Sequence, residues 1–348
     1  LVQKAHERGM KVVLDAVYNH TGREFFAFAD ILENGEKSKY RDWYFIDGFP
    51  LKSEWGEIPN FKCFGYYGGM PKLNLKNPEV EKYITDVACY WIKECDIDGW
   101  RLDVGDEISH FFWKNFRKAV KAVKKDMLII GEIWHYAGDF LEGDEWDTVM
   151  NYPFYLNLID LLADEKITVS QFVQNLGYLK GRLHKNCYPL MWNLIDSHDT
   201  ARFLHLCNDN KKKQHLAAAF QLLLPGMPMI YYGDEYAMPG ANDPDCRRGM
   251  YWDEEYQDKE MYEWYKRLIQ VRKSHACIVE GELAGSVTED EEGTIVLIRK
   301  NGEETIAMIF NCSSSAKKFN EYTQKYNLLT ENTFDGNVEG FDAAVIVL

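Results

Sequence analysis

The sequence lacks the cysteine patterns that mark zinc proteins and disulfide scaffolds. Its eight cysteines are scattered and include no Cys-x-x-Cys pair, so neither a zinc site nor a disulfide framework is indicated. Reduced thiols are therefore expected, as in a cytoplasmic protein.

Long apolar runs and an excess of basic residues are also missing. No segment reaches the roughly 20 apolar residues that a membrane span needs, and the first residues do not resemble a signal peptide. Lysine and arginine total 40 against 55 aspartates and glutamates, which gives a net charge of −15. This balance argues against nucleic acid and against an anionic membrane surface as partners, because both need concentrated positive charge.

The composition that is present is ordinary for a globular protein. With 348 residues, of which 46% are hydrophobic, the chain can bury the core of one large α/β unit and a smaller module. The aromatic share of 14% suits a site that stacks sugar rings, although most of these side chains are expected in the core.

Apolar runs alternate with segments of helical periodicity as far as residue 232, which predicts parallel strands covered by helices. Asp15, Asp103 and Glu132 stand at strand ends, and Asp199 lies just beyond another. Functional residues at the carboxyl ends of strands are typical of a (β/α)8 TIM barrel, whereas the glycine-rich fingerprint of a doubly wound sheet is missing. The first two of the eight barrel strands are not found. The six expected strands span residues 11–17, 97–103, 127–133, 146–152, 188–195 and 226–232.

Residues 78–94 have helical spacing and predict a helix. Asn77 can serve as its N-cap, and Pro78 takes the first helical position.

Two parts of the sequence do not follow this alternation of strands and helices. Residues 21–76 are rich in glycine and aromatic side chains and are too long for a simple loop, so they predict a subdomain inserted after barrel strand 3. Residues 277–348 alternate apolar and polar positions and contain Asn301-Gly302, a hairpin signal, so they predict a C-terminal antiparallel β-sandwich domain. The barrel itself is expected to span residues 1–20 and 77–276.

Arg101 and Asp103 lie two residues apart in a predicted strand, so their side chains share one face of it. A guanidinium at this distance favours the ionised form of the aspartate. An ionised aspartate that is held in place can act as a nucleophile. A structural ion pair at the end of a strand explains the same two residues equally well.

Asp103, Glu132 and Asp199 come from separate strand ends, which a barrel brings to one rim. Retaining glycoside hydrolysis needs two carboxyl groups, one to attack the anomeric carbon and one to protonate the leaving oxygen and later activate water. Asp103, beside Arg101, suits the nucleophile. Glu132, in an apolar strand, suits the general acid/base, because burial favours its protonated form.

Asp199 would bind sugar hydroxyls and stabilise the positive charge that develops on the sugar. His20 and His198 would donate hydrogen bonds to the same ring. Each histidine taken alone is better explained as a structural residue.

Four segments resemble, in order, the signature regions of the α-amylase family of glycoside hydrolases: residues 15–20, 99–107, 131–135 and 197–199. Residues 70–74, Met-Pro-Lys-Leu-Asn, resemble a motif that separates the neopullulanase, cyclomaltodextrinase and maltogenic amylase group from ordinary α-amylases. Residues 233–235 and 242–248 are similar to this group's sequence after the last barrel strand. Together the matches cover nearly the whole chain.

The resemblance implies an α-glucan substrate, net retention, and the roles given above to Asp103, Glu132 and Asp199. It also implies sugar contacts from three residues: His20, Arg101 and His198. A further three resemble residues on the acceptor side of the site, although loop packing explains them equally well: Glu107, Trp134 and His135.

Asp15 and Asn19 are expected to brace the site. In many amylases the equivalent of Asn19 binds calcium, but this group often lacks that ion. The resemblance therefore implies neither a metal nor a cofactor.

Members of this group usually carry an N-terminal β domain that forms much of a dimer interface, and neither that domain nor the first two barrel strands is found in the sequence. We therefore expect a fragment with little activity of its own, from a parent protein that is a candidate homodimer.

Two alternatives stay open. An oligo-α-1,6-glucosidase or a transglycosylase of the same family would carry the same residues. A non-catalytic sugar-binding barrel need not retain three carboxylates together with Arg101, so this sequence disfavours it.

Overall fold

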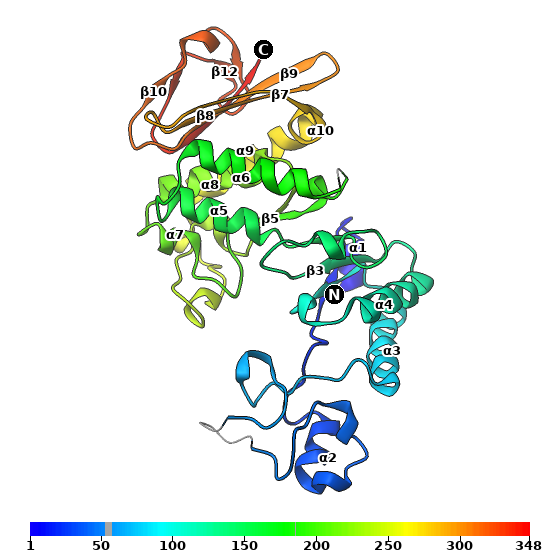
Figure 1. The fold of residues 1–348 in the computed structure, drawn as a ribbon. Coiled ribbons are helices and arrows are strands. Elements are labelled where there is room, and N and C mark those ends of the chain that lie inside the picture. The colour runs from blue at the N-terminus through cyan, green and yellow to red at the C-terminus, as the bar shows by residue number, and fades with distance from the viewer. Residues whose placement is uncertain (53–57, 185) are drawn as a thin grey trace. The chain divides into compact units, whose positions relative to one another are not determined.

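The computed structural model describes residues 1–52, 58–184 and 186–348 (Figure 1). The contacts among them define two compact units. Unit 1 comprises Leu1–Ile133 and Ala137–Met150, and unit 2 comprises Trp134–Tyr136 and Asn151–Leu348.

Unit 1 is built on a four-stranded parallel sheet in the order β1-β2-β3-β4. Its register pairs Asp15 with Arg101 and Leu102 with Gly131, so the residues that follow these strands leave the sheet at one edge. All four strands lie inside the ranges predicted from the sequence. They are β1 (Val13–Ala16), β2 (Gly99–Leu102), β3 (Leu128–Gly131) and β4 (Thr148–Val149).

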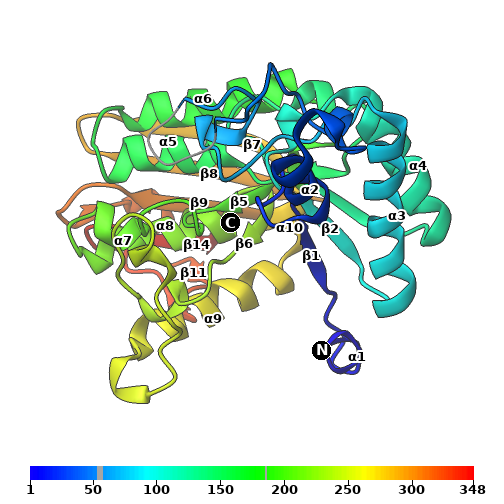
Figure 2. The same cartoon turned by 90° about the horizontal axis from the view of Figure 1, so that it is seen from below.

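The two long helices of unit 1, α3 (Pro78–Cys95) and α4 (His110–Val123), pack side by side (Figure 2). The predicted start of α3 is confirmed, because the Asn77 side chain accepts a hydrogen bond from Glu79 N and Pro78 occupies the first turn. Ser109 caps α4 in the same way. Residues at helical spacing form the buried face of α3: Val80, Ile84, Ala88 and Ile92. A short helix, α1 (Val2–His6), precedes β1.

The segment between residues 21 and 76 contains a helix that the sequence reading missed, α2 (Phe26–Asn34). The Phe28 ring of α2 packs against Tyr44 at 5.0 Å and against Phe61 at 5.2 Å between ring centroids. Isolated antiparallel bridges, such as the one between His20 and Lys72, connect parts of this segment and join it to the end of β1. The described residues of this segment are therefore organised around aromatic side chains rather than around a regular sheet.

Unit 2 contains two further parallel strands, β5 (Trp192–Leu194) and β6 (Met227–Met229), which complete the six predicted from the sequence. The predicted strand 188–195 is wrong in its first half. Residues Tyr188–Leu190 form a short 3₁₀ helix instead, since Pro189 has no N–H to give to a sheet. The helices are α5 (Tyr152–Leu162), α6 (Val169–Arg182), α7 (Phe203–Leu206), α8 (Lys211–Leu223), α9 (Lys259–Ser274) and α10 (Ala276–Glu280).

The C-terminal part of unit 2 is the predicted antiparallel sheet, with six strands in the order β12-β11-β14-β9-β8-β7. The hairpin signal is confirmed, because Asn301 pairs with Glu304 across a turn in which Gly302 has a φ of 60°. A separate ladder joins β10 (Lys317–Lys318) to β13 (Asn337–Val338). The six strands are β7 (Glu282–Glu289), β8 (Thr294–Asn301), β9 (Glu304–Asn311), β11 (Tyr326–Asn327), β12 (Asn332–Thr333) and β14 (Asp342–Val347).

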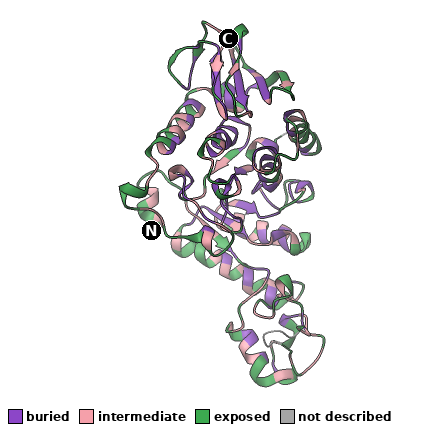
Figure 3. Cartoon of the chain, turned by 90° about the vertical axis from the view of Figure 1, so that its left-hand side faces the viewer, coloured by how far each residue is buried: buried purple, intermediate pink, exposed green. Residues whose placement is uncertain are grey.

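The central strands of this sheet, β8, β9 and β14, consist largely of buried residues (Figure 3). Their apolar side chains contribute to two separate cores. Side chains alternate along a strand, so Met308 and Phe310 of β9 join the core that contains α8, where Phe220 stacks on Phe310 at 4.3 Å. Ala307 and Ile309 enter a second core on the other face. The sheet is therefore attached to the helical part of unit 2 by close packing.

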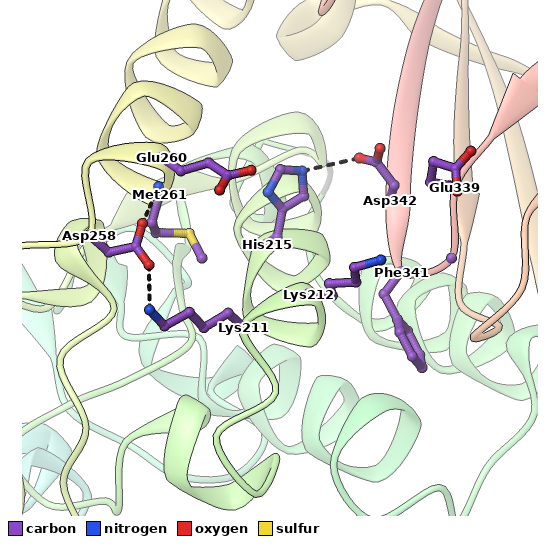
Figure 4. A pocket seen from close by; sticks show the side chains of 10 residues that line it. Lys211, Lys212, His215, Asp258, Glu260, Met261, Glu339, Phe341 and Asp342 are labelled. Carbon is purple, nitrogen blue, oxygen red and sulfur yellow. Dashed lines mark hydrogen bonds and ion pairs between the residues drawn. The ribbon is translucent and has the colours of Figure 1, made fainter.

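Polar contacts support the same junction (Figure 4). His215 of α8 stacks on Trp264 of α9 at 3.8 Å, and its Nε2 lies 3.1 Å from Asp342 Oδ1 at the start of β14. Lys211 Nζ donates to Asp258 Oδ2 at 2.6 Å, next to the start of α9.

Within the ranges that the structure describes, no helix is both long enough and apolar enough to cross a membrane. All eight cysteines are free thiols.

A buried carboxylate ties the beginning of β2 to neighbouring elements of unit 1. Asp98 Oδ2 accepts hydrogen bonds from Val12 N and from His6 Nε2, both at 2.8 Å, and its Oδ1 accepts one from Lys124 Nζ at 3.0 Å. Burial opposes ionisation, but these donors outweigh it and lower the pKa of Asp98 from 3.8 to about 2.

We predict that Asp98→Asn lowers the free energy of unfolding by about 2 kcal/mol at neutral pH. Because the folded pKa lies below the ordinary value, this stabilisation is present above pH about 4 and is lost as the pH falls through about 2. Urea denaturation at a series of pH values measures both effects.

Asp96→Asn is the matched control. Asp96 also pairs with Lys124, at 2.7 Å, but its side chain is 71% exposed, so its loss should cost less than about 0.5 kcal/mol. Equal effects of the two substitutions would contradict the role given to Asp98.

Candidate active site

Arg101 is the centre of the polar cluster at the end of the unit 1 sheet. Its Nη1 lies 2.8 Å from both Asp15 Oδ1 and Asp103 Oδ1. Its Nη2 lies 2.9 Å from Glu132 Oε2, a contact that is an ion pair rather than an aligned hydrogen bond. One guanidinium therefore joins the predicted nucleophile, the predicted acid/base and a supporting carboxylate.

The charge of Arg101 is held by these neighbours. Burial disfavours a charged guanidinium, but attraction to Glu132, Asp15 and Asp103 outweighs it and raises the pKa of Arg101. Arg101 therefore remains a fixed positive charge throughout the working range of any enzyme.

Glu132 is buried, as the sequence predicted, and its backbone N–H continues the sheet by donating to Leu102 O at 3.0 Å. Its Oε2 also accepts a hydrogen bond from Val104 N at 3.0 Å. Burial favours the neutral acid, whereas Arg101 and the Val104 N–H favour the carboxylate. The side chain of Glu132 thus faces one cation and one N–H donor directly after β3.

A close approach of two elements fixes the backbone next to Glu132. A Cβ on Gly131 would collide with the Trp146 ring, which is itself stacked on Phe140 at 4.0 Å. Only glycine therefore allows this packing at position 131.

Lys72 belongs to a second group of polar contacts in unit 1 and was given no role from the sequence, although it lies in the Met-Pro-Lys-Leu-Asn motif. Its Nζ lies 2.8 Å from Glu107 Oε2 and also contacts Asn19 Oδ1. Asn19 Nδ2 donates to the same Glu107 oxygen at 3.3 Å. The inserted segment thereby connects Asn19, a predicted brace, with Glu107, a predicted acceptor-side residue.

His20 stacks on Phe64 at 5.3 Å with an angle of 10° between the rings. Burial lowers the pKa of His20, Asp103 and Glu107 oppose this effect, and Lys72 adds to it. The ring is therefore neutral at pH 7 and able to donate one hydrogen bond and accept another.

A cleft of about 390 Å³ adjoins this part of unit 1. Asn19, Lys72 and Glu107 line one part of it, and aromatic rings from Phe45 and Phe140 line another. Polar groups converging in an open cleft are typical of a ligand site.

Asp199 lies at an exposed turn of unit 2. Its carboxylate contacts His198 Nε2 at 3.2 Å and Arg247 Nη2 at 3.2 Å. Arg247 also donates from Nε to His198 O at 2.9 Å. Arg247 lies in the stretch 242–248 that carried part of the resemblance, but the sequence alone gave it no role.

The base of this turn is fixed by a fully buried charge cluster. Asp196 Oδ1 accepts a hydrogen bond from Phe203 N at 2.5 Å, and Arg202 Nη1 donates to Asp234 Oδ1 at 3.1 Å. The other oxygens of Asp196 and Asp234 receive no donor among the described groups, yet the two carboxyl groups are within hydrogen-bonding reach of each other. Two ionised carboxylates cannot satisfy one another, so one proton must be shared between them.

Burial raises the pKa of both carboxyl groups, and repulsion by Asp234 raises the pKa of Asp196 further. We assign the proton to Asp196, which leaves Asp234 charged beside Arg202. The base of the turn that carries His198 and Asp199 is thus held in place by a neutral acid, Asp196, and by the ion pair between Arg202 and Asp234.

We predict that wild-type stability falls as the pH rises above about 4, because the folded protein keeps a proton on this pair that the unfolded chain releases near the ordinary pKa of 3.8. Asp196→Asn keeps a neutral donor in place, so it should remove most of this pH dependence and cost less than about 1 kcal/mol at pH 7. Thermal unfolding across this pH range is the measurement.

Asp234→Ala is the contrasting variant. It leaves the Arg202 guanidinium buried without its counter-charge and should cost about 3 to 5 kcal/mol. A strong pH dependence that persists in Asp196→Asn would contradict the shared proton.

Trp134 and His135, the other predicted acceptor-side residues, belong to unit 2. The Trp134 indole stacks on Tyr152 at 3.9 Å and keeps 40% of its surface exposed. His135 is exposed, with Nδ1 3.3 Å from Tyr136 O.

The structure thus brings Asp15, Arg101, Asp103 and Glu132 together in unit 1, and it holds His198 and Asp199 together in unit 2. That all three predicted catalytic carboxylates meet at one sugar remains a prediction. In the described parts of the chain, no group of three or more histidine, cysteine, aspartate or glutamate side chains is placed to hold a metal ion.

Comparison with known proteins identifies the class to which this fold and cluster belong. Residues 1–281 match the family model described as "Alpha amylase, catalytic domain". The chain is therefore a member of the α-amylase family of glycoside hydrolases, with its TIM-barrel-like α/β fold.

Within this family the chain is similar to the cyclomaltodextrinase, neopullulanase and maltogenic amylase group. It is 46% identical to a cyclomaltodextrinase of Geobacillus thermopakistaniensis (strain MAS1) over 316 residues, which is 91% of this chain and 53% of the relative. It is 43% identical to neopullulanase 2 of Thermoactinomyces vulgaris over 312 residues, 89% of this chain and 53% of the relative. The solved structure of a cyclomaltodextrinase superposes with a TM-score of 0.94 at 38% identity, covering 99% of this chain and 61% of that one. The chain spans about half the length of the curated relatives it matches.

Proposed function

We propose that the protein is a retaining α-glucan hydrolase that cleaves α-1,4-glucosidic bonds in cyclodextrins, pullulan or maltooligosaccharides. The observation that carries this proposal is the bridge by Arg101 between Asp103 and Glu132. It supplies two carboxyl groups in one cluster, as a double-displacement mechanism needs. The names of the similar proteins, cyclomaltodextrinase and neopullulanase 2, suggest the substrates.

In the first step the Asp103 carboxylate attacks the anomeric carbon, while Glu132 gives its proton to the leaving glycosidic oxygen. A covalent glycosyl ester forms on Asp103, and Glu132 is left as a carboxylate. In the second step Glu132 takes a proton from water, whose oxygen attacks the same carbon and releases Asp103. Two inversions give net retention.

The charge near Arg101 stays constant during the first step. Before it, the negative charge is on Asp103 and Glu132 is neutral; after it, Asp103 is an ester and Glu132 is charged. Arg101 contacts both Asp103 and Glu132, so the guanidinium attracts the negative charge on either carboxylate without having to move.

The remaining residues have supporting roles in this proposal. Asp199, with His198, binds sugar hydroxyls and adds negative potential where the oxocarbenium-like charge develops. His20 donates to the same sugar. Three residues contact the acceptor side: Glu107, Trp134 and His135. We also propose a cytoplasmic location, which free thiols suit, and a homodimer for the longer protein.

We predict that Glu132→Gln lowers the rate on maltooligosaccharides by about 10²- to 10⁴-fold, since the amide cannot protonate the leaving group. With α-maltosyl fluoride, whose leaving group needs no proton, the variant should still form the covalent intermediate. Mass spectrometry of the trapped ester on Asp103 and a fluoride-release burst test this outcome.

Glu142→Gln is the control for removing one carboxylate from unit 1, because Glu142 is exposed and outside the Arg101 cluster. It should keep the wild-type rates on both substrates. An unchanged rate in Glu132→Gln would overturn the acid/base assignment.

Product analysis separates this proposal from an oligo-α-1,6-glucosidase. We predict maltose from cyclodextrin and panose from pullulan, because the enzyme cleaves the α-1,4 bonds and leaves the α-1,6 bonds intact. Hydrolysis of α-1,6 bonds only, as in isomaltose, would favour the alternative enzyme.

A further inference from the structure

One buried side chain closes the base of the turn that carries Asp199, which we define as residues 197–202 and call the Asp199 turn. Asp196 lies two residues after β5, and its Oδ1 accepts a hydrogen bond at 2.5 Å from the backbone N–H of Phe203, the first residue of α7 (Figure 1). Within the turn, Asp199 N donates to Ser197 Oγ at 3.2 Å. The place of the Asp199 backbone therefore depends on the place of Asp196.

The Asp199 turn is attached to the segment that follows β6. Arg202 donates from its backbone N to Gly240 O at 2.9 Å and from Nη1 to Asp234 Oδ1 at 3.1 Å. The carboxyl groups of Asp196 and Asp234 are fully buried and lie within hydrogen-bonding reach of each other. At this junction, two carboxyl groups therefore meet beside one guanidinium.

The charges at the junction balance only while one of the two carboxyl groups keeps a proton. With one proton, a single carboxylate faces Arg202. Without it, two carboxylates repel each other beside one guanidinium, in a place that is closed to solvent. Loss of the proton therefore favours separation of the Asp199 turn from the segment after β6.

Other titratable groups around the pair do not supply a second cation. Lys213, whose charge acts on Cys207, is paired with Glu165 at 2.6 Å. The remaining groups are neutral or acidic: Tyr155 of α5, Cys207 at the end of α7, Tyr265 of α9, and Tyr231 and Glu235 on either side of Asp234 in the chain.

We propose that Asp196 is a positioning residue for Asp199: the proton shared with Asp234 holds the Asp199 turn in place, and loss of this proton at alkaline pH releases it. The inference rests on the proposed function, in which Asp199 binds the sugar. Asp196 is fully buried, so it acts through the turn and not on the substrate. Burial raises the pKa of both carboxyl groups, which moves the release above the ordinary range of an aspartate.

Glu132 must also be protonated in the first step, so alkaline loss of activity on a glucan does not by itself identify Asp196. α-Maltosyl fluoride removes this ambiguity, because its leaving group needs no proton. Its kcat/KM reports the steps up to fluoride release and is therefore independent of the proton on Glu132.

The first test measures kcat/KM for α-maltosyl fluoride between about pH 6 and about pH 10. In the wild type we expect a fall that approaches about tenfold per pH unit, because only the protonated pair holds the turn. Asp196→Asn should give a level profile, since its amide donates to Asp234 without a proton that titrates. Asp253→Asn, at an exposed aspartate of the same unit, should keep the wild-type fall. A level wild-type profile, or an equal fall in Asp196→Asn, would contradict the inference.

The second test does not depend on activity. Cys246 is a buried free thiol that donates from Sγ to His198 O in the Asp199 turn at 3.4 Å, so release of the turn exposes it. At about pH 9, iodoacetamide should label Cys246 about tenfold faster in the wild type than in Asp196→Asn, as measured by peptide mass spectrometry. Comparison at one pH cancels the effect of thiol ionisation. Cys277, buried in α10 of the same unit, should react equally in both proteins.

The labelling separates failure of this inference from failure of the proposed function. Faster labelling of Cys246 in the wild type supports release of the turn even if no α-glucan is hydrolysed, in which case only the proposed function fails. Equal labelling of Cys246 in the two proteins overturns the inference. A parallel increase at Cys277 also overturns it, because the whole unit would then be opening rather than the turn.

Discussion

The polar cluster of unit 1 depends on one partly buried guanidinium that contacts three carboxyl groups at once. A single arginine can do this because its planar group presents donors in several directions, whereas a lysine offers one point charge. The cost of burying so much charge is offset because every carboxylate in the cluster contacts the same cation. The arrangement is also suited to a reaction in which negative charge moves from one of these carboxylates to another.

The two units stabilise their clusters of charged side chains in different ways. At the base of the Asp199 turn, one of two neighbouring carboxyl groups is neutral, and the arginine needs to balance only the other. The Arg101 cluster is partly open to solvent, since half of the Asp15 side-chain surface is exposed, whereas the Asp196 cluster is closed to solvent. The first arrangement suits chemistry, and the second suits holding a loop in one position.

Much of the fold could be predicted because parallel strands and their helices leave strong periodic signals. The start of α3 at Asn77 and Pro78 and the turn at Gly302 follow from local chemistry, so they were found. The sequence did not predict helix α2, since its apolar positions are shared with the irregular aromatic packing around it. The first half of the strand predicted over residues 188–195 is wrong, because Pro189 has no N–H to give to a sheet.

At the site, residue types and spacing predicted that Arg101 pairs with Asp103 and that Glu132 lies near them. This was possible because the register of neighbouring strands determines which side chains meet. The roles of Lys72 and Arg247 could not be read in the same way. Both reach their partners from irregular segments, where sequence separation says nothing about distance. The same holds for Arg202 and Asp234, whose pairing over 32 positions depends on tertiary packing alone.

The contact between Gly131 and the Trp146 ring limits how an enzyme on this scaffold can be altered. Any larger residue at 131 would meet the Trp146 indole directly before Glu132, so the position cannot be used to adjust the surroundings of the proposed proton donor. Changes in substrate choice must therefore come from segments that can vary without moving this strand, such as residues 70–74 and 134–136. A rigid backbone beside the reacting group and adaptable loops around it would let related chains differ in specificity while sharing one chemistry.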